Sequence, residues 1–137
     1  MQINFSAAFD NVNHQRILYK LCSVGIGGSV LSILTQFLSN LTQHAMVYGC
    51  RSKLVNVVSG VPQGSVLAPL LFLLYTSELI SILENKLIGY ANDTLKAVVP
   101  SPGIRVAVAE SLSCNLVKVS EWCDVWEMKL NARRLRL

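Results

Sequence analysis

The pattern of apolar and polar residues predicts short strands alternating with helices. The opening residues QINFS at 2–6 alternate in polarity, which favours a strand. From Asn13 onward, Ile17, Leu18 and Leu21 recur at helical spacing, and the glycines at 25–28 end this helix. A second helix is predicted to begin at Ser29, with its apolar residues on one face.

The second half of the chain continues this alternation. Residues 43–58 predict a hairpin that turns near Gly49, and the loop SGVPQGS follows. The pattern then predicts that residues 67–83 form the most buried helix of the chain. It also predicts two short strands in KLIGY and TLKAVV joined by a tight turn at 91–93, and a long helix at 104–126. The final residues MKLNARRLRL indicate the start of one further strand.

This order of elements predicts an α+β fold, with an antiparallel sheet and helices packed on one face. The length of 137 residues favours a single domain, and the 52% hydrophobic content is sufficient for a core. Internal repeats and linkers are absent from the sequence. A disordered chain is excluded, because such chains are poor in apolar residues.

The most apolar stretch, Val66 to Leu83, is predicted to be a core helix and not a membrane span. It contains Pro69 and Glu78 and is shorter than the roughly 20 apolar residues that a bilayer requires. The first residues lack the features of a signal peptide, which favours an intracellular location in the cytoplasm or nucleus. The four cysteines form no CxxC pair and are predicted to be buried, reduced thiols.

The net charge of +4 does not indicate a basic groove. Four of the twelve basic residues lie in the last nine positions, and the others balance the eight acidic residues. Nucleic-acid binding by charge requires clustered Lys and Arg, so the pI of about 9.0 does not predict it. The basic end is interpreted as a solvated terminus.

Three segments in fixed order carry a resemblance to a known family: FSAAFDNVNH at 5–14, SGVPQGSVLAPLLF at 59–72 and GYANDT at 89–94. Together with SEWCDVWEMKLNARR at 120–134, they resemble the palm of a reverse transcriptase of the non-LTR (LINE-type) retrotransposons. By this resemblance, residues 4–14, 59–72, 89–94 and 120–134 correspond to motifs A, B, C and D of one partial palm domain, which lacks complete fingers and thumb.

The resemblance implies an RNA-directed DNA polymerase, a nucleotidyltransferase that adds dNTPs to a DNA primer on an RNA template. Such chemistry uses two Mg²⁺ ions that stabilise the attacking and leaving oxygens. Magnesium prefers anionic oxygen ligands, so carboxylates from separate strands must meet at one edge of the sheet. In the family, these are the Asp that opens the first motif and two Asp in a turn after tyrosine.

The sequence departs from the family at two of these three catalytic positions. Asn4 stands where the first Asp is expected, and Asn92 stands where the turn's first Asp is expected, which leaves Asp93 as the metal ligand. If each lost carboxylate removed about 3 to 4 kcal/mol of transition-state stabilisation, the rate would fall by roughly four to six orders of magnitude. The resemblance therefore predicts a pseudoenzyme, in which Mg²⁺ binding is doubtful.

Other positions resemble the family's substrate-binding residues. Phe9 resembles the residue that packs under the sugar, Gln63 and Gly64 belong to the segment beside the incoming nucleotide, and Tyr90 resembles the residue beside the primer end. Arg134 stands where the family has a lysine; it would hold phosphate but donate a proton poorly. Taken singly, each of these residues also fits a purely structural role.

Three hypotheses therefore remain open from the sequence: an active polymerase palm, a catalytically silent retrotransposon remnant, and a module that binds RNA or a partner without chemistry. His14 and His44 stand apart from other ligand-type residues and are interpreted as capping or surface histidines. Glu127 replaces a glycine that is common in the family. Uncovered apolar faces would make the isolated chain poorly soluble, and its oligomeric state stays open.

Overall fold

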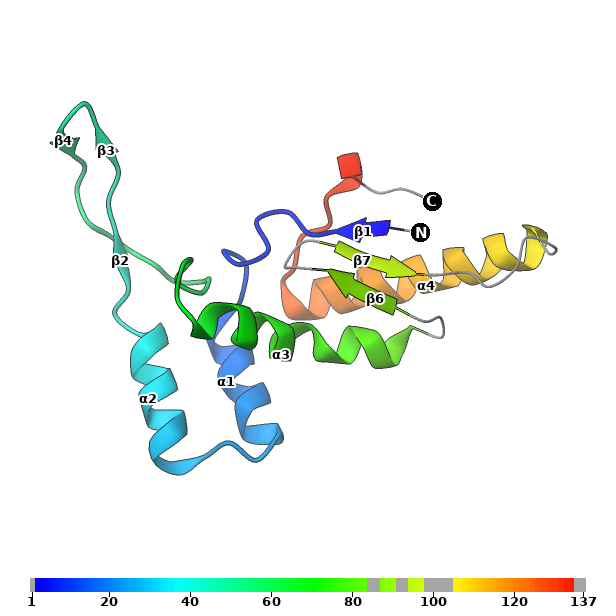
Figure 1. The fold of residues 1–137 in the computed structure, drawn as a ribbon, viewed down its shortest axis with the longest axis horizontal. Helices are drawn as coiled ribbons and strands as arrows, with labels where there is room; N and C mark the ends of the chain where they lie inside the picture. The colour runs from blue at the N-terminus through cyan, green and yellow to red at the C-terminus, as the bar shows by residue number, and fades with distance from the viewer. Residues whose placement is uncertain (1, 84–86, 91–93, 98–104, 135–137) are drawn as a thin grey trace.

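A computed structural model describes residues 2–83, 87–90, 94–97 and 105–134. It has the predicted mixed α+β composition, with helices and small antiparallel sheets (Figure 1). The elements follow one another in this order: β1 (Gln2–Asn4), α1 (His14–Ser23), α2 (Gly28–Leu38), β2 (Thr42–Gln43), β3 (Met46–Val47), β4 (Cys50–Arg51), β5 (Val55–Asn56), α3 (Leu67–Ile82), β6 (Leu87–Tyr90), β7 (Thr94–Ala97), α4 (Arg105–Trp126) and a 3₁₀ turn (Ala132–Arg134).

The main sheet has the strand order β1-β7-β6, and both pairings are antiparallel. Strand β1 therefore pairs with β7, the last of the three strands in sequence, although more than 80 residues separate them along the chain. On the other edge of β1, Phe5 forms an isolated bridge with Leu130. The predicted C-terminal strand is thus reduced to this bridge, because the chain turns into a 3₁₀ helix two residues later.

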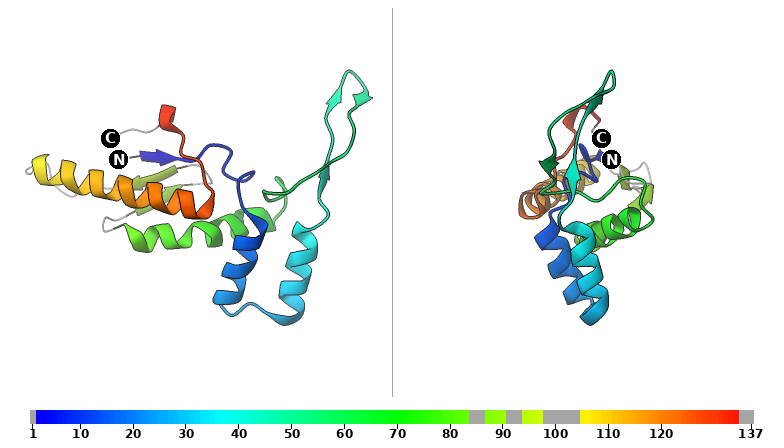
Figure 2. Two further views of the ribbon diagram at one scale, coloured as in Figure 1. Left: turned by 180° about the vertical axis from the view of Figure 1, so that it is seen from behind. Right: turned by 90° about the vertical axis from the view of Figure 1, so that its left-hand side faces the viewer.

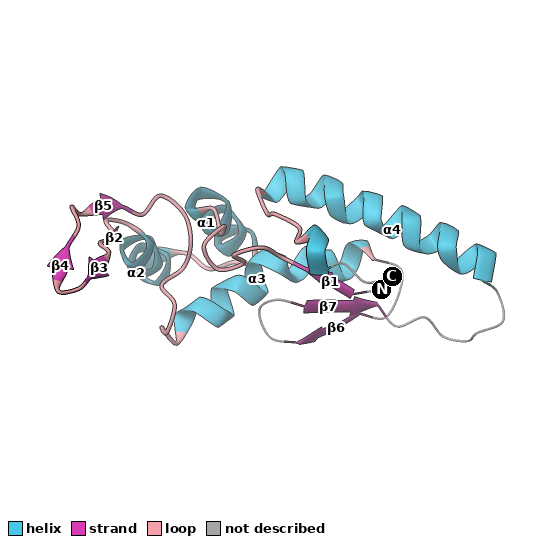
Figure 3. Ribbon diagram, turned by 90° about the horizontal axis from the view of Figure 1, so that it is seen from above, coloured by secondary structure: helices cyan, strands magenta, loops and turns pink. Residues whose placement is uncertain are grey.

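The body of the molecule is a core between the sheet and two long helices. Figure 2 shows α4 crossing one face of the sheet with α3 beside it, and Figure 3 shows both helices on the same side. The Trp122 ring of α4 lies 6.2 Å from the Phe5 ring and stacks at 5.9 Å on Trp126. Among the described helices, α3 and α4 cover this face, whereas α1 and α2 lie beyond one end of the sheet (Figure 1).

Helix α1 begins where the sequence predicts. The Asn13 side chain accepts hydrogen bonds from the backbone N–H groups of Gln15 and Arg16, which caps the helix. Gly25 adopts a φ of +86° just beyond its end, as a helix-terminating glycine does. Ile17 and Leu21 of this helix are buried in the core.

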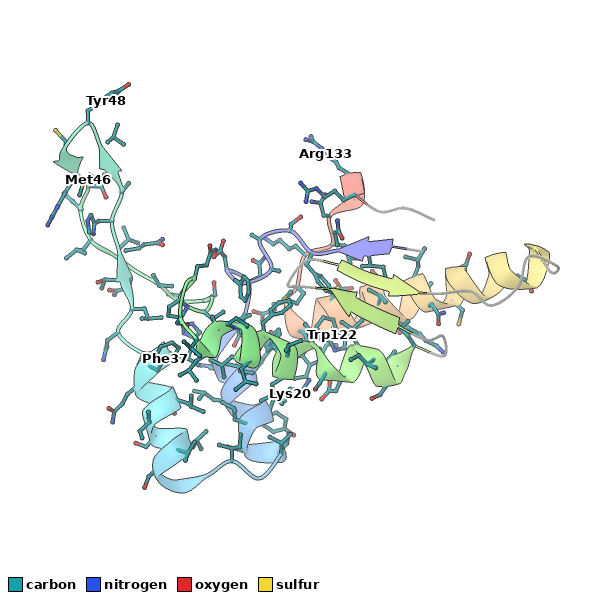
Figure 4. All side chains as sticks on the ribbon, in the orientation of Figure 1. Lys20, Phe37, Met46, Tyr48, Trp122 and Arg133 are labelled. Atoms are coloured by element: carbon teal, nitrogen blue, oxygen red, sulfur yellow. The ribbon has the colours of Figure 1, made fainter. Side chains whose placement is uncertain are left out.

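A buried lysine joins three helices at the centre of this body. Lys20 Nζ of α1 donates to the Tyr75 carbonyl of α3 at 2.9 Å, pairs with Glu78 at 3.4 Å and lies 4.5 Å from the centre of the Trp126 ring. Burial lowers the pKa of Lys20, and Glu78 partly offsets this effect. Lys20 of α1 thereby contacts both α3 and α4 (Figure 4).

The predicted hairpin at 43–58 is formed and projects from the body (Figure 1). Its inner pair joins Val47 to Cys50, and its outer pair joins Gln43 to Val55. The register shifts by one residue between these pairs, because the returning strand carries one extra residue, which is a β-bulge. Side chains along both arms are exposed.

One prediction of burial is wrong. Helix α3 buries Leu71, Tyr75 and Leu79 in the core and also exposes a second apolar face. Of the four cysteines, Cys123 is buried, whereas Cys22, Cys50 and Cys114 are exposed. Burial depends on which elements meet in the folded chain, and residue type alone does not decide it. None of the helices in the described part of the chain combines the length and apolar character that a bilayer-spanning segment requires.

Candidate functional site

The first predicted catalytic position, Asn4, is the last residue of β1 and is buried with 6% of its surface exposed. Asn4 pairs with Thr94, the first residue of β7, and Thr94 also pairs with Tyr90, the last residue of β6. The last residues of β1 and β6 and the first residue of β7 therefore lie at the same end of the sheet. The connection between β6 and β7 contains Asn92 and Asp93, which lie outside the described residues.

The residues that the structure describes do not provide a metal centre. Within these ranges, no group of three or more His, Cys, Asp and Glu side chains could hold an ion. Asn4 offers a neutral amide, and Asp10, the acidic residue nearest to it in sequence, is hydrogen-bonded to Gln63. A magnesium ion prefers several anionic oxygens, so the described donor set does not fit it.

Phe9 follows β1 in an irregular segment and packs against α3. Its ring lies 5.3 Å from the Phe72 ring, with the ring planes inclined by 54°. The Phe9 side chain is half-buried, so part of it faces solvent. The backbone carbonyl of Phe9 also accepts a hydrogen bond from the Val61 N–H at 2.9 Å.

The loop that contains Gln63 lies directly against the segment that follows β1. The Gly60 N–H donates to the Val12 carbonyl at 2.8 Å, and Ser59 Oγ donates to the Asp10 carbonyl at 2.9 Å. A Cβ atom on Gly60 would lie 2.9 Å from the Asp10 Cα and 3.1 Å from the Phe9 oxygen. Gly60 also has a φ of +96°, so both its conformation and the close approach require glycine.

Two side chains from residues 10–14 hold this loop in place. Gln63 Nε2 donates to the Asp10 carboxylate at 3.0 Å. His14 Nε2 lies 2.6 Å from the Gly60 carbonyl oxygen, which can only accept, so Nε2 carries the proton. We call Asp10, His14, Gly60 and Gln63 the loop clamp.

The loop clamp corrects the sequence interpretation of His14 as a capping or surface histidine. The preceding residue, Asn13, caps α1, whereas His14 reaches a residue 46 positions away in the chain. The sequence also did not predict the contact between Asp10 and Gln63. No spacing rule could have found either contact, because both depend on how two distant loops meet in the folded chain.

Three residues of the loop clamp, Asp10, Gly60 and Gln63, line a cavity with a volume of about 580 Å³. Residues at the base of the hairpin also line it. The lining is mixed, with amide, hydroxyl and carboxylate groups beside apolar side chains: Asp10, Leu41, Thr42, Gln43, Asn56, Val57, Val58, Ser59, Gly60, Val61, Pro62 and Gln63. Such a lining suits a polar ligand with an apolar part. Gly64, the last residue of the PQG segment, is exposed with a φ of +85°.

The C-terminal segment reaches the same strand from its other edge. The Asn131 N–H donates to the Asn4 carbonyl at 2.8 Å, and the Ser6 N–H donates to the Lys129 carbonyl at 2.7 Å. Arg134 follows on the exposed 3₁₀ turn, and its N–H donates to the Asn131 carbonyl at 3.0 Å. Because this segment runs antiparallel to β1, the chain direction after Asn131 leads away from the end where Asn4 meets Thr94.

Glu127 occupies a backbone position that favours glycine. Its φ is +57°, and its carboxylate accepts hydrogen bonds from Asn13 at 2.9 Å and Arg16 at 3.0 Å. These two hydrogen bonds lower the pKa of Glu127. The left-handed conformation gives a physical reason why glycine is common here in the resembled family, and the contacts with α1 help to hold Glu127 in it.

The comparisons with known proteins agree on one family. The family model of the reverse transcriptase (RNA-dependent DNA polymerase) matches residues 1–136. The RNA-directed DNA polymerase from mobile element jockey of Drosophila melanogaster is 30% identical over 140 residues, which cover 96% of this chain and 15% of that protein. Its counterpart from Drosophila funebris is 29% identical and covers 95% of this chain. The chain thus spans about 15% of the length of these curated relatives.

Proposed function

This chain belongs to the reverse transcriptase family, and from that premise we propose that it is a palm domain in which Asn4 and Asn92 disable nucleotide addition. The observation that carries the proposal is the position of Asn4 at the end of β1, paired with the first residue of β7. Carboxylates at position 4 and in the 91–93 connection would belong to the same end of the sheet. This supports the assignment of both asparagines to metal-ligand positions.

The loss of charge is the physical reason for inactivity. The family uses divalent metal ions, which stabilise developing negative charge when nucleotides are added. An asparagine offers an oxygen ligand without charge, so two negative charges are lost and Asp93 stays as the ligand. At about 3 to 4 kcal/mol for each carboxylate, nucleotide addition would be slower by roughly four to six orders of magnitude.

The substrate-binding part of the proposal has separate support. The ring of Phe9 packs against Phe72, and the loop clamp holds Gln63 where it lines the cavity. We assign to this region the dNTP, with Gln63 and Gly64 against the nucleotide, Phe9 under its sugar and Tyr90 near the DNA primer end. Arg134, which the resemblance assigns to phosphate, would have to reach it from the other edge of β1, where its segment lies. The RNA template belongs to the same proposal.

A second candidate function is binding of RNA or a partner without chemistry. The intact loop clamp favours it, because residues 59–64 are held by several hydrogen bonds although the catalytic positions have changed. Under this function, the chain would bind a primed RNA template with an affinity that falls as salt is raised. A remnant without function would bind no template.

The decisive experiment compares the chain with the variant Asn4→Asp/Asn92→Asp. Mn²⁺ binding, followed by electron paramagnetic resonance, should be weak in the chain and at least about tenfold tighter in the variant, because two negative charges return. Adding Asp93→Ala to the variant should weaken the binding again. Equal Mn²⁺ affinity in the chain and the variant would contradict the proposal.

Primer extension on an RNA template provides the functional readout. Extension by the double variant, together with silence of the natural chain, would support the assignment directly. Extension by the natural chain that is lost in Asp93→Ala would mean that asparagine serves as a metal ligand here, and the proposal of inactivity would be wrong. Salt-sensitive binding of the template without extension by the natural chain would support the second candidate function.

A further inference from the structure

One face of α3 is apolar and open to solvent. Val66, which precedes the helix, is 92% exposed, and Leu70, Leu73 and Ile80 are 63%, 62% and 60% exposed. The opposite face, with Leu71, Tyr75 and Leu79, is buried against the body. We call Val66, Leu70, Leu73, Ser77 and Ile80 the α3 stripe (Figure 4 shows the side chains of this helix on the ribbon).

The spacing of the α3 stripe is that of a helix-pairing seam. Its members follow one another at intervals of four, three, four and three residues, the repeat that keeps side chains in line along a helix that packs against another helix. Ser77 is its polar member, and its hydroxyl already donates to the Leu74 carbonyl at 2.9 Å. The stripe can therefore be covered without leaving that hydroxyl unpaired.

The charge pattern of α3 suits pairing with itself. The charged residue of this helix is Glu78, whose carboxylate pairs with Lys20 of the same chain at 3.4 Å. The stripe itself carries no charge, so two copies would meet without repulsion. A strongly charged partner would find no complementary group on the stripe.

From these observations we propose that the α3 stripe docks against the α3 stripe of a second copy of this chain, antiparallel about a two-fold axis at Leu73. In this arrangement Val66 faces Ile80, Leu70 faces Ser77, and Leu73 faces Leu73 of the second copy. Antiparallel pairing also brings together the opposite ends of the helix dipoles. The interface is isologous and closes at two copies.

The surface area that the α3 stripe would bury in a pair of chains is that of a weak dimer. An aliphatic side chain that is more than half exposed leaves on the order of 100 Å² open to water, so the stripe and its neighbours would bury roughly 1,000 Å² in a pair. This is near the lower limit for specific interfaces, so the dissociation constant should lie in the micromolar range, about 1 to 100 μM. The proposal is independent of whether position 4 binds metal.

Sedimentation equilibrium of the full chain tests the proposal over about a hundredfold range of concentration. We expect a monomer–dimer equilibrium that Leu73→Glu weakens at least about tenfold. Ile33→Glu is the matched control, because Ile33 on α2 is also 62% exposed but lies outside the stripe. A chain that stays monomeric, a chain that grows beyond dimers without limit, or equal effects of the two variants would each overturn the proposal.

Charge swapping and cross-linking test the orientation. A mixture of Leu73→Glu and Leu73→Lys copies should form heterodimers more tightly than either variant forms homodimers, because position 73 faces itself. With the exposed Cys22, Cys50 and Cys114 replaced by serine, Val66→Cys copies should form disulfides with Ile80→Cys copies and not with one another. Failure of the mixture to pair, or cross-links between two Val66→Cys copies, would overturn this arrangement. Circular dichroism establishes that each variant keeps its helices.

Discussion

Gly60 is the residue on which the loop clamp most depends. Its N–H is bonded to Val12, its carbonyl to His14, and its missing side chain leaves room for the backbone of Asp10. Positive φ and close approach are separate requirements, and Gly60 meets both. The nearby Gly64 has a positive φ but has open space around it, so it provides a natural comparison.

Gly60→Ala should therefore destabilise the fold more than Gly64→Ala does. We expect a loss of about 3 kcal/mol in the free energy of unfolding for Gly60→Ala, because strain in φ and a steric clash act together. Gly64→Ala should cost about 1 kcal/mol from the backbone conformation alone. Urea unfolding monitored by circular dichroism measures both, and equal losses would mean that the Asp10 contact relaxes without cost.

Cys123 provides a prediction for pH. Burial, with a smaller contribution from Asp124, raises the pKa of the Cys123 thiol from 9.0 to about 12. Between these values the unfolded chain loses the thiol proton while the folded chain keeps it, so stability falls as pH rises above 9. The contribution should be about 1 kcal/mol by pH 10.

Urea unfolding of Cys123→Ala at pH 8 and pH 10 isolates this effect. The variant should lose less stability over this interval than the natural chain does, whatever its cost at pH 8. Cys114→Ala, on the same helix but exposed, is the control and should leave the pH dependence unchanged. An identical pH dependence in all three proteins would show that the Cys123 thiol is accessible to water in the folded state.

Among the elements, the hairpin from β2 to β5 is stabilised largely by its own backbone. Tyr48 and Gly49 form its turn, with φ values of +48° and +80°, as in a two-residue turn of type I′. The Tyr48 side chain is fully exposed at 102%, so it contributes no packing to offset its strained conformation. A substitution at Tyr48 that relieves this strain should therefore stabilise the hairpin.

Tyr48→Asn should stabilise the hairpin, because asparagine tolerates the left-handed region better than tyrosine does. We expect a gain of about 0.5 to 1 kcal/mol in local stability, seen as slower amide exchange at Val47 and Cys50. Tyr48→Val should have the opposite effect, since a β-branched residue is disfavoured at positive φ. Faster exchange in the asparagine variant would contradict the assigned turn.

The whole molecule combines a packed body with an exposed arm. The body contains the sheet, α1, α3 and α4, whereas the hairpin extends away from it (Figure 2). Residues with few buried contacts open at low free-energy cost, and core strands open only with the fold as a whole. The hairpin and the body should therefore differ in local stability.

Hydrogen exchange followed by mass spectrometry should separate these two parts. Peptides that cover 42–56 should exchange at least about tenfold faster than those that contain Ile3 and Asn4 of β1. Ile3 is fully buried, and β1 is bonded on both edges. Uniform protection across the chain would mean that the arm is packed in solution, for example by a second molecule.

Much of the fold could be predicted from the sequence. The starts of all four helices lie within one residue of the predicted positions, because apolar periodicity, the Asn13 cap and glycine stops act locally. The hairpin at 43–58 and the strands in KLIGY and TLKAVV also follow from local pattern. The prediction of a C-terminal strand was wrong. Leu130 forms an isolated bridge with Phe5, and this pairing depends on the free edge that β1 presents in the folded chain.

Motif resemblance singled out the residues of the candidate site, but the sequence did not predict its geometry. The register of β1, β6 and β7 places Asn4 at the end of the sheet where β6 ends at Tyr90. The predicted roles stay predictions for all of the residues that the resemblance named: Asn4, Phe9, Gln63, Gly64, Tyr90, Asn92, Asp93 and Arg134. The contacts of Asp10 and His14 join residues 46 to 53 positions apart, and no local pattern encodes such contacts.

The sequence by itself determined the family and the order of the elements, because motifs and periodicity are properties of neighbouring residues. The tertiary structure alone decided the loop clamp, the exposure of three cysteines and the open face of α3. The physical reason is that α3 is apolar all round, so its sequence requires burial but does not specify which face the chain itself covers.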